Sequence, residues 1–475
     1  MLKNYKLLLA FVLLFCTQLS ADTWTKTYGG TGYDVARSVQ QTKDSGFIVV
    51  GYTNSFGAGN YDIYLIKTNS SGDTLWTRTF GGTNDDKGYS VRQTKDSGFI
   101  IAGTTYSFGA DSGDVYLIRT NSLGDTLWTK TFGGTDKDYG YLVQQTQDSG
   151  FIIAGTTYSF GAGSADVYLI KINFSGDTLW TKTFGGTNWD YGYSVQQTFD
   201  GGFIIVGGTG SFGVSDGAVY LIKTDSLGDT LWSKTFPGEG RCTSGNSVQQ
   251  TSDSGFIIAG TILVAGEGPG ASFVYLIRTN SSGNTLWAGN SGTNNSAGES
   301  VQQTQDGGFI ITGHLSNMYG GTYLIRIDSL GNNLWKKVFS GSGGYSVQEL
   351  QDNGFIIAGY TYSGDVCLIK TDSLGYVAVE ESSTPQSAFQ NPQLQISPNL
   401  FTNQTVLMYQ IPATSKVSLS FYDITGSCVK TLVNELKPAG TYSILLNSNG
   451  LKTGVYFCKM QAGDFKATTK LTLLK

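Results

Sequence analysis

The sequence predicts an all-β protein: a seven-bladed β-propeller followed by a small antiparallel β-sandwich. Two observations carry this prediction. The first is a repeat whose final tryptophan recurs at spacings of 52, 52, 52, 52, 55 and 48 residues. A fixed period of this size is typical of repeat architectures, in which each unit buries its apolar face against the next. The second is that each repeat holds four short β-like segments and no long apolar pattern of period 3.6. The seven tryptophans are Trp24, Trp76, Trp128, Trp180, Trp232, Trp287 and Trp335.

In the third repeat the four segments are YLVQQT (141–146), GFIIAG (150–155), VYLIKI (167–172) and DTLWTKTF (177–184). They are rich in the β-branched and aromatic residues that pleated strands favour. The FIIA run is apolar at every position, which indicates a strand covered on both faces. Four antiparallel strands repeated seven times describe propeller blades. A β-solenoid is the alternative, and it would need capped ends.

The connection between the first two segments carries the turn signal Asp-x-Gly-Phe in all seven repeats. Asp accepts a hydrogen bond from its own backbone two residues on, and Gly tolerates positive φ, so we expect tight hairpins. The tryptophans recur in every repeat, which favours packing between blades over a single aromatic binding platform. The seven aspartates are Asp44, Asp96, Asp148, Asp200, Asp253, Asp306 and Asp352.

The phase of the repeat indicates how the ring closes. The segment DTWTKTY (22–28) is a lone fourth strand, whereas the seventh repeat stops after its third strand, VCLIKT (366–371). We expect the strand of Trp24 to complete that last blade. This arrangement leaves no unpaired sheet edge at the seam.

The sequence segment YLIKTN–SSG–DTLW (64–76) resembles the tryptophan-docking motif of quinoprotein-type propellers, and it is similar to other secreted bacterial propeller repeats. The resemblance covers residues 22–375. It implies that the tryptophan strand is outermost and that SVQQ (38–41) lines the central channel. Buried amides must be paired, so we also expect Gln40 and Gln41 to join neighbouring blades. The catalytic residues of quinoproteins have no counterpart here, and we expect no cofactor and no metal ion.

Composition and the N-terminal residues indicate an exported protein. Only 14% of the 475 residues are charged and the net charge is −5, which argues against nucleic acid and anionic membranes as partners. Residues 1–21 are typical of a signal peptide, with Lys3 and Lys6 ahead of the apolar run 7–15 and a small residue at Ala21. We therefore expect the mature chain to be a monomer that begins near residue 22 and has no transmembrane segment.

The C-terminal part has its own organisation. Residues 380–393 are rich in Ser, Pro and Gln, as a linker is. In residues 394–475, short alternating strands predict a small antiparallel sandwich. The motifs of this module resemble the type IX secretion C-terminal sorting domain, which implies contact with the secretion machinery and a secreted or surface-attached protein. They are SPNLF (397–401), YDITG (422–426), PAGTY (438–442), GVYF (454–457) and KLTLLK (470–475).

Two further features leave alternatives open. Cys428 and Cys458 either pair within the C-terminal module or stay free. A recurring aspartate after each tryptophan strand either caps a turn or binds calcium, and we favour turn-capping because later repeats carry Thr243, Ser296 and Ser342 at the same position. The aspartates are Asp34, Asp86, Asp138 and Asp190.

Candidate binding residues lie where the repeats differ. The loops joining strands two and three, and those joining successive blades, are long and share one face, where we expect binding. Trp189 is the one tryptophan out of phase with the repeat, and the irregular fifth and sixth blades break the symmetry. The predicted site residues are Trp189, Arg241, Glu267, His314 and Tyr319.

These features predict a secreted or surface-displayed propeller that binds an extracellular glycan, protein or surface polymer. Enzyme signatures are scarce, because the chain has one histidine and no phosphate-cradling or dinucleotide motif. We therefore predict no catalytic residues. Two alternatives stay open: a polysaccharide hydrolase or lyase with carboxylates on the long-loop face, and a structural adhesin without a specific ligand.

Overall fold

The computed structural model divides the chain into two compact units, Met1–Ala378 and Val379–Lys475. Within the described residues, no helix has the length and apolar character needed to cross a membrane. The predicted signal peptide and residues 380–392 of the predicted linker lie outside the described residues. The structure describes residues 23–377 and 393–474, with gaps at 111, 214–216, 239–240, 265–270, 293, 316–319, 340, 398–399, 402–403, 412–413, 438–439, 449–450 and 464.

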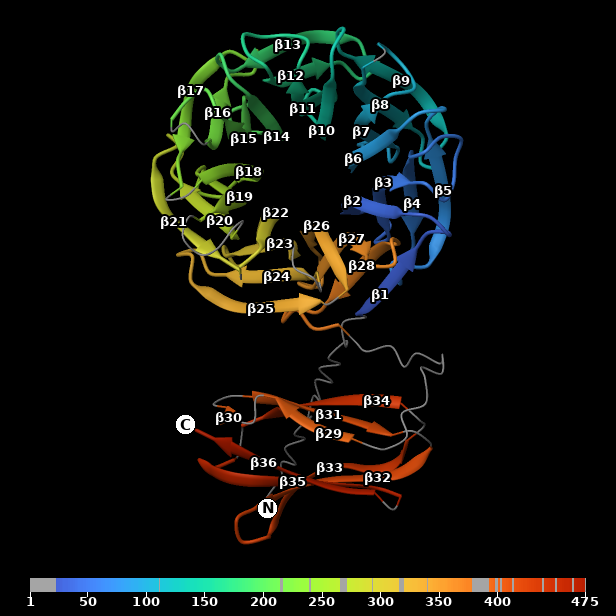
Figure 1. Ribbon diagram of the computed structural model, residues 1–475, viewed down its shortest axis with the longest axis vertical. Coiled ribbons are helices and arrows are strands. Elements are labelled where there is room, and N and C mark those ends of the chain that lie inside the picture. The colour runs from blue at the N-terminus through green and yellow to red at the C-terminus, as the bar shows by residue number, and fades with distance from the viewer. Residues whose placement is uncertain are drawn as a thin grey trace, which may run out of the picture. The chain divides into compact units, whose positions relative to one another are not determined.

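In the first unit the described residues form seven four-stranded antiparallel sheets, which are arranged around a ring as the blades of a propeller (Figure 1). The innermost strands are β2 (Asp34–Gln41), β6 (Asp86–Gln93), β10 (Asp138–Gln145), β14 (Asp190–Gln197), β18 (Arg241–Gln250), β22 (Ser296–Gln303) and β26 (Ser342–Glu349). The second strands are β3 (Phe47–Thr53), β7 (Phe99–Thr105), β11 (Phe151–Thr157), β15 (Phe203–Thr209), β19 (Phe256–Leu263), β23 (Phe309–Leu315) and β27 (Phe355–Thr361).

The third strands are β4 (Asp62–Thr68), β8 (Asp114–Thr120), β12 (Asp166–Ile172), β16 (Ala218–Thr224), β20 (Ser272–Thr279), β24 (Thr322–Ile327) and β28 (Val366–Thr371). The outermost strands are β5 (Thr74–Phe80), β9 (Thr126–Phe132), β13 (Thr178–Phe184), β17 (Thr230–Phe236), β21 (Thr285–Ser291), β25 (Asn333–Phe339) and β1 (Trp24–Tyr28). We number the blades one to seven in the order of their innermost strands. The tryptophan strands are therefore outermost, as the resemblance implies.

The seventh blade takes its outer strand from the other end of the unit. Strand β1 pairs antiparallel with β28, so that Trp24 lies opposite Lys370 and Tyr28 opposite Val366. This is the pairing that the phase of the repeat predicts. The two ends of the propeller sequence thus share one sheet, and the seam has the same strand order as the other blades.

The blades pack through an apolar layer that explains the repeated sequence. Second strands such as β7 are buried along their whole length because neighbouring blades cover both faces. Each repeat tryptophan meets the first phenylalanine of the next blade edge-on, with ring centroids 5.7–6.3 Å apart. This confirms packing between blades as their role. Trp24 is fully buried, whereas the other six repeat tryptophans are half-buried.

The second unit is a sandwich of two sheets around one apolar core, as predicted. Cys428 and Cys458 are both free thiols, so the possible disulfide between them does not form. The first sheet contains β29 (Gln393–Ser397), β31 (Gln404–Ile411) and β34 (Gly440–Asn447). The second contains β30 (Leu400–Phe401), β36 (Phe465–Leu473), β35 (Gly454–Ala462), β32 (Ser415–Asp423) and β33 (Cys428–Lys437).

The recurring aspartates at the start of the innermost strands cap turns, as predicted. Asp86 is fully buried, and its Oδ2 accepts the N–H of Gly82 at 2.9 Å and the hydroxyl of Ser107 at 2.6 Å. The same pair of donors binds the carboxylate in the other three blades that carry the aspartate. A buried carboxylate needs such donors, because leaving it without them costs several kcal/mol.

A second carboxylate from the preceding blade faces each of these aspartates; it is buried in three of the four pairs, whereas Asp365 is half-buried. A methyl group built on Gly81 would lie 1.9 Å from Oδ1 of Asp62 and 2.7 Å from Oδ2 of Asp86. At each interface between successive blades, these two positions either both carry a carboxylate or both lack one. Two like charges placed together oppose ionisation. The paired residues are Asp62–Asp86, Asp114–Asp138, Asp166–Asp190 and Asp365–Asp34, and the positions without carboxylates are Ala218–Thr243, Phe273–Ser296 and Gly321–Ser342.

We predict that Asp114→Asn stabilises the propeller at neutral pH. Burial and the neighbouring Asp138 raise the pKa of Asp114, so the folded state holds this proton more tightly than the unfolded state does. Stability from this group is therefore present below about pH 4 and lost as the pH rises through the folded pKa. Asn still accepts the N–H of Ala110 and donates to Asp138. We expect a gain of about 1 kcal/mol at pH 7, the scale of one pKa unit.

The measurement is thermal unfolding of the wild type, of Asp114→Asn, of Asp138→Asn and of the double variant, at pH 4 and pH 7. If the two carboxylates repel each other, the double variant gains less than the two single variants together. A loss of stability in Asp114→Asn at pH 7 with additive effects in the double variant would contradict this account.

Candidate ligand-binding channel

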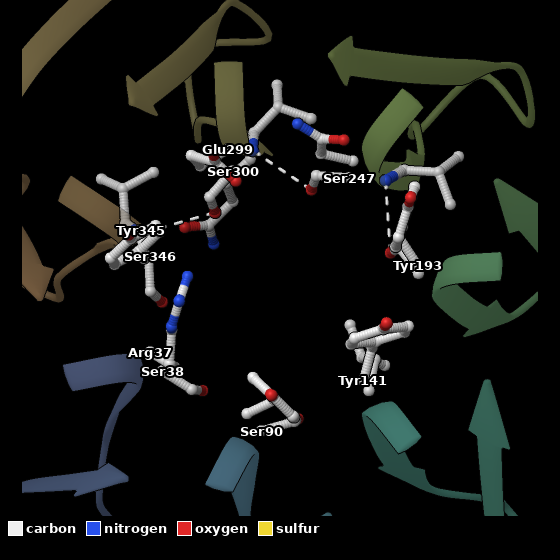
Figure 2. Close-up of a pocket in the computed structure, with 18 of the residues that line it drawn as sticks. Arg37, Ser38, Ser90, Tyr141, Tyr193, Ser247, Glu299, Ser300, Tyr345 and Ser346 are labelled. Carbon is white, nitrogen blue, oxygen red and sulfur yellow. Dashed lines mark hydrogen bonds between the residues drawn. The ribbon is translucent and has the colours of Figure 1, made fainter. Parts of the chain in front are cut away.

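A cavity of ≈ 700 Å³ lies at the centre of the ring, and all seven innermost strands contribute to its wall (Figure 2). The resemblance placed SVQQ on this channel, and Ser38, Val39 and Gln40 do line it. Figure 2 shows Arg37 on one wall, near Tyr345 and Glu299, with Tyr141 and Tyr193 on the wall across from it.

Each innermost strand carries a β-bulge at the same place. In β2 the pairing register with β3 shifts between Ala36 and Ser38, which leaves Arg37 without a paired residue. A bulge re-aims the side chain of the extra residue, and here the bulged residues line the cavity. In six blades a glycine precedes the bulge; a methyl group on Gly140 would lie 2.6 Å from Val115 of the preceding blade. We call the bulged residues the bulge ring: Arg37, Tyr89, Tyr141, Tyr193, Asn246, Glu299 and Tyr345.

Tyrosines form one side of the bulge ring. The ring centroid of Tyr141 lies 5.4 Å from those of both Tyr89 and Tyr193. Tyr191, which does not itself line the cavity, contacts Tyr193 with ring centroids 6.1 Å apart, and Trp189 stacks on Tyr191 with centroids 5.1 Å apart. The result is a continuous aromatic surface from the second to the fourth blade, which can hold the flat face of a ligand.

Three tyrosines of the bulge ring, Tyr89, Tyr141 and Tyr345, have raised pKa values and stay protonated at neutral pH. Burial raises the pKa of Tyr89 to about 12, despite the opposing effect of Arg37. Burial also raises the pKa values of Tyr141 and Tyr345. These three tyrosines therefore present neutral phenol groups to the channel.

Arg37 lies against tyrosines rather than against a carboxylate. Its guanidinium carbon is 3.9 Å from the ring centroid of Tyr345, a cation–π contact. Its Nη2 lies 3.3 Å from the hydroxyl of Tyr52, while its Nε is buried and has no hydrogen-bond partner among the described residues. The guanidinium is therefore held by aromatic rings and one hydroxyl, and among the described residues it forms no ion pair with a carboxylate.

Glu299 and His314 meet on the sixth blade. Nδ1 of His314 lies 3.2 Å from Oε1 of Glu299, and both side chains are about one-fifth exposed, at 22%. The imidazole also contacts Tyr345, with ring centroids 5.8 Å apart. The polar side of the bulge ring therefore presents a carboxylate, an amide at Asn246 and, beside them, the histidine.

A second level of the channel is formed by glutamines that join the blades. Oε1 of Gln40 accepts the backbone N–H of Gln93 in the next blade at 2.6 Å, and the same bond recurs at five other interfaces. Two residues earlier in the strand, a serine hydroxyl such as that of Ser38 accepts the N–H of a valine in the next blade. The predicted role of the glutamines in joining blades is thus confirmed.

Arg92 takes the glutamine position in the second blade. A guanidinium has no acceptor atom, so Arg92 cannot bind the N–H of Gln145 in the third blade. Instead it lines the channel, where its Nη1 lies 3.1 Å from the carbonyl oxygen of Val91. We call this level the glutamine ring: Gln40, Arg92, Gln144, Gln196, Gln249, Gln302 and Gln348.

Of the five predicted site residues, two lie near the channel, and the side chains of the other three are outside the described part of the chain. Trp189 and His314 lie beside the channel wall, and the ring of Trp189 occupies the space left by Gly210 and Gly217. Arg241 begins β18, but its side chain lies outside the described part of the chain, as do Glu267 and Tyr319. Sequence reasoning missed the bulge ring. Its signal was present, because the residue before SVQQ changes between otherwise similar repeats.

Comparison with known proteins identifies the C-terminal unit. Residues 395–473 match the family model of the secretion system C-terminal sorting domain. This tail is a type IX sorting domain. It marks the chain for export by type IX secretion to the cell surface or the extracellular space, and it implies contact with the secretion machinery. The match says nothing of the propeller's ligand.

The remaining likenesses are more distant. The regulatory protein FlaEY of Caulobacter vibrioides (strain ATCC 19089 / CIP 103742 / CB 15) is 26% identical over 199 residues, which cover 36% of this chain and only 20% of FlaEY. PorZ, a surface component of the type IX secretion system of Porphyromonas gingivalis, is 10% identical with a TM-score of 0.45, covering 92% of this chain and 59% of PorZ. A family 25 polysaccharide lyase, an ulvan lyase, is 11% identical with a TM-score of 0.49, covering 73% of this chain and 96% of the lyase.

We predict that Arg92→Gln stabilises the propeller. The new side chain has the acceptor that six other interfaces use, so it supplies the missing bond to Gln145 and removes a buried charge. We expect a gain of about 1 kcal/mol, the net value of one hydrogen bond. The matched control is Gln144→Leu, which removes the bond to Gln197 and should lose a similar amount. Thermal or denaturant unfolding measures the stability of both variants. If both variants gained stability, or both lost it, the role of these glutamines in joining blades would be contradicted.

Proposed function

We propose that the propeller is a binding module that works outside the cell, and that its ligand is a glycan held at the bulge ring. The observation that carries this proposal is the composition of that ring. Three tyrosines occupy one side of these seven equivalent positions, and an asparagine, a glutamate, the fourth tyrosine (Tyr345) and an arginine occupy the rest. A ring of identical side chains would suit a purely structural role, whereas a specific site must break the symmetry.

The chemistry of the two sides supports a sugar ligand. The aromatic wall from Tyr89 through Tyr141 to Tyr193 offers flat surfaces, on which the apolar face of a sugar ring can pack. The opposite side offers the Glu299 carboxylate, the Asn246 amide and the Arg37 guanidinium, which can bind hydroxyl groups. Pockets that combine apolar walls with a few placed polar groups are the usual form of a small-ligand site.

Binding is favoured over glycoside hydrolysis by the count of carboxylates. Most glycosidases use two carboxyl groups on either side of the scissile bond. Among the described residues that line the channel, Glu299 is the only carboxylate. The contact between Glu299 and His314 supports a second candidate, a lyase or hydrolase in which this pair transfers a proton, with Tyr345 beside it.

We expect the mature chain, residues 22–475, to bind a subset of a glycan and surface-polymer array. Tyr141→Ala should weaken binding at least tenfold, because it removes the centre of the aromatic wall. The matched control is Leu127→Ala on the exposed outer strand β9, which should leave affinity unchanged. Affinity is measured by calorimetry on each array hit. Binding that is insensitive to Tyr141→Ala would place the site elsewhere, and silence across the array would contradict a glycan ligand.

The same array hits distinguish binding from turnover. We expect no shortened or unsaturated product after prolonged incubation, by mass spectrometry. Product that disappears in both Glu299→Gln and His314→Ala would overturn the binding assignment and establish the enzyme.

A further inference from the structure

The glutamine ring presents hydrogen-bond donors to the channel. At each of its six glutamines, the partner of Oε1 is a backbone N–H, which can only donate. This fixes which end of each amide is oxygen, because an Nε2 at that position would face another donor. The Nε2 group of each glutamine is therefore the end of the amide that can donate a hydrogen bond to a ligand in the channel. No acceptor among the described residues binds it.

Arg92 adds a positive charge at the same level. Its guanidinium has only donors, so this residue continues the pattern of the ring rather than neutralising it. The ring thus combines six amide N–H₂ groups with one guanidinium. A ligand group that satisfies all of them at once must be an acceptor, and one with negative charge.

The charge of Arg92 is not offset by a protein carboxylate. Seven lysines and arginines are buried inside the blades, and each forms an ion pair with the hairpin aspartate of its own blade; Arg119, for example, binds Asp96 through Nη2. Arg92 has no such partner among the described residues, and burial lowers its pKa. A buried cation without a counter-charge is costly. The other six pairs are Lys67–Asp44, Lys171–Asp148, Lys223–Asp200, Arg278–Asp253, Arg326–Asp306 and Lys370–Asp352.

We propose that the glutamine ring is an anion-binding site that accepts an oxyanion group, a carboxylate, sulfate or phosphate. The three groups share the relevant chemistry: several acceptor oxygens around one negative charge, which match N–H donors converging from different blades. The site is separate from the bulge ring, which holds the channel's carboxylate, Glu299. It does not depend on the nature of the ligand bound there.

The test uses selenate, a sulfate analogue with strong anomalous scattering, and the full mature chain. We expect anomalous density inside the glutamine ring of soaked crystals, within hydrogen-bond distance of Arg92. Calorimetry should show that Arg92→Gln weakens selenate binding at least tenfold, because it removes a charged hydrogen bond of about 1.5–3 kcal/mol. Arg92→Gln restores the residue found in the other six blades, so loss of binding would not reflect unfolding.

The matched control is Arg37→Tyr, which removes the other channel arginine and installs the commonest residue of the bulge ring. It should leave selenate affinity unchanged. Absence of selenate from the ring, equal affinity in Arg92→Gln, or a loss confined to Arg37→Tyr would each overturn the proposal. Tyr141→Ala separates this result from the glycan proposal, since it should weaken glycan binding at least tenfold and leave selenate binding unchanged.

The oxyanion can belong to the channel's ligand or be a free ion, and one further arm distinguishes the two. If the group is part of an acidic glycan, selenate should compete with that glycan, and desulfated or carboxyl-reduced versions should bind at least tenfold more weakly. If it is a free ion, glycan and selenate should bind together without competition. Both results keep the oxyanion site and assign its source.

Discussion

The bonds between glutamine side chains and the backbone of the next blade are the constraint on which the rest of the channel depends. The innermost strand of a blade pairs with a neighbour on one side only, so the N–H groups of its other edge have no strand partner. An uncovered strand edge can pair with another chain and cause aggregation. Gln40 and Ser38 of one blade bind the N–H groups of Gln93 and Val91 in the next, and this covers the edge around the ring.

These bonds also decide the polarity of the channel. Because each glutamine oxygen faces a backbone N–H of the next blade, its nitrogen is left for the cavity. A structural requirement repeated around the ring thereby produces a level of the channel that consists of donors. The bulge next to it adds one side chain per blade whose identity varies around the ring, and of these Asn246 donates a hydrogen bond to the carbonyl oxygen of Gly298 in the next blade. Scaffold and site therefore occupy neighbouring positions of the same strand.

The fold follows from the sequence because its determinants are local and repeated. The spacing of Trp76, the apolar run after Phe99 and the hairpin at Asp96 recur in each blade, so each repeat confirms the interpretation of the others. The bulge is different. Simple alternation along β2 places Arg37 on the face opposite Ser38 and Gln40, whereas the register shift brings all three to the channel. Such a shift depends on contact with the preceding blade, which the sequence pattern of one strand does not reveal.

Departures from the repeat are therefore more informative than the repeat itself. Departures in the loops and in the fifth and sixth blades predicted Trp189 and His314, and His314 contacts Glu299 and Tyr345 of the channel. The innermost strands depart from the repeat as well, at the bulge ring and at Arg92. At Arg92 the departure has a definite cost: one bond between blades is lost, and a charge is placed where no carboxylate offsets it. Local rules that are broken without a compensating contact are expected at functional positions. The seven paired cations inside the blades show how this chain treats a charge that serves only stability, and Arg92 is treated differently.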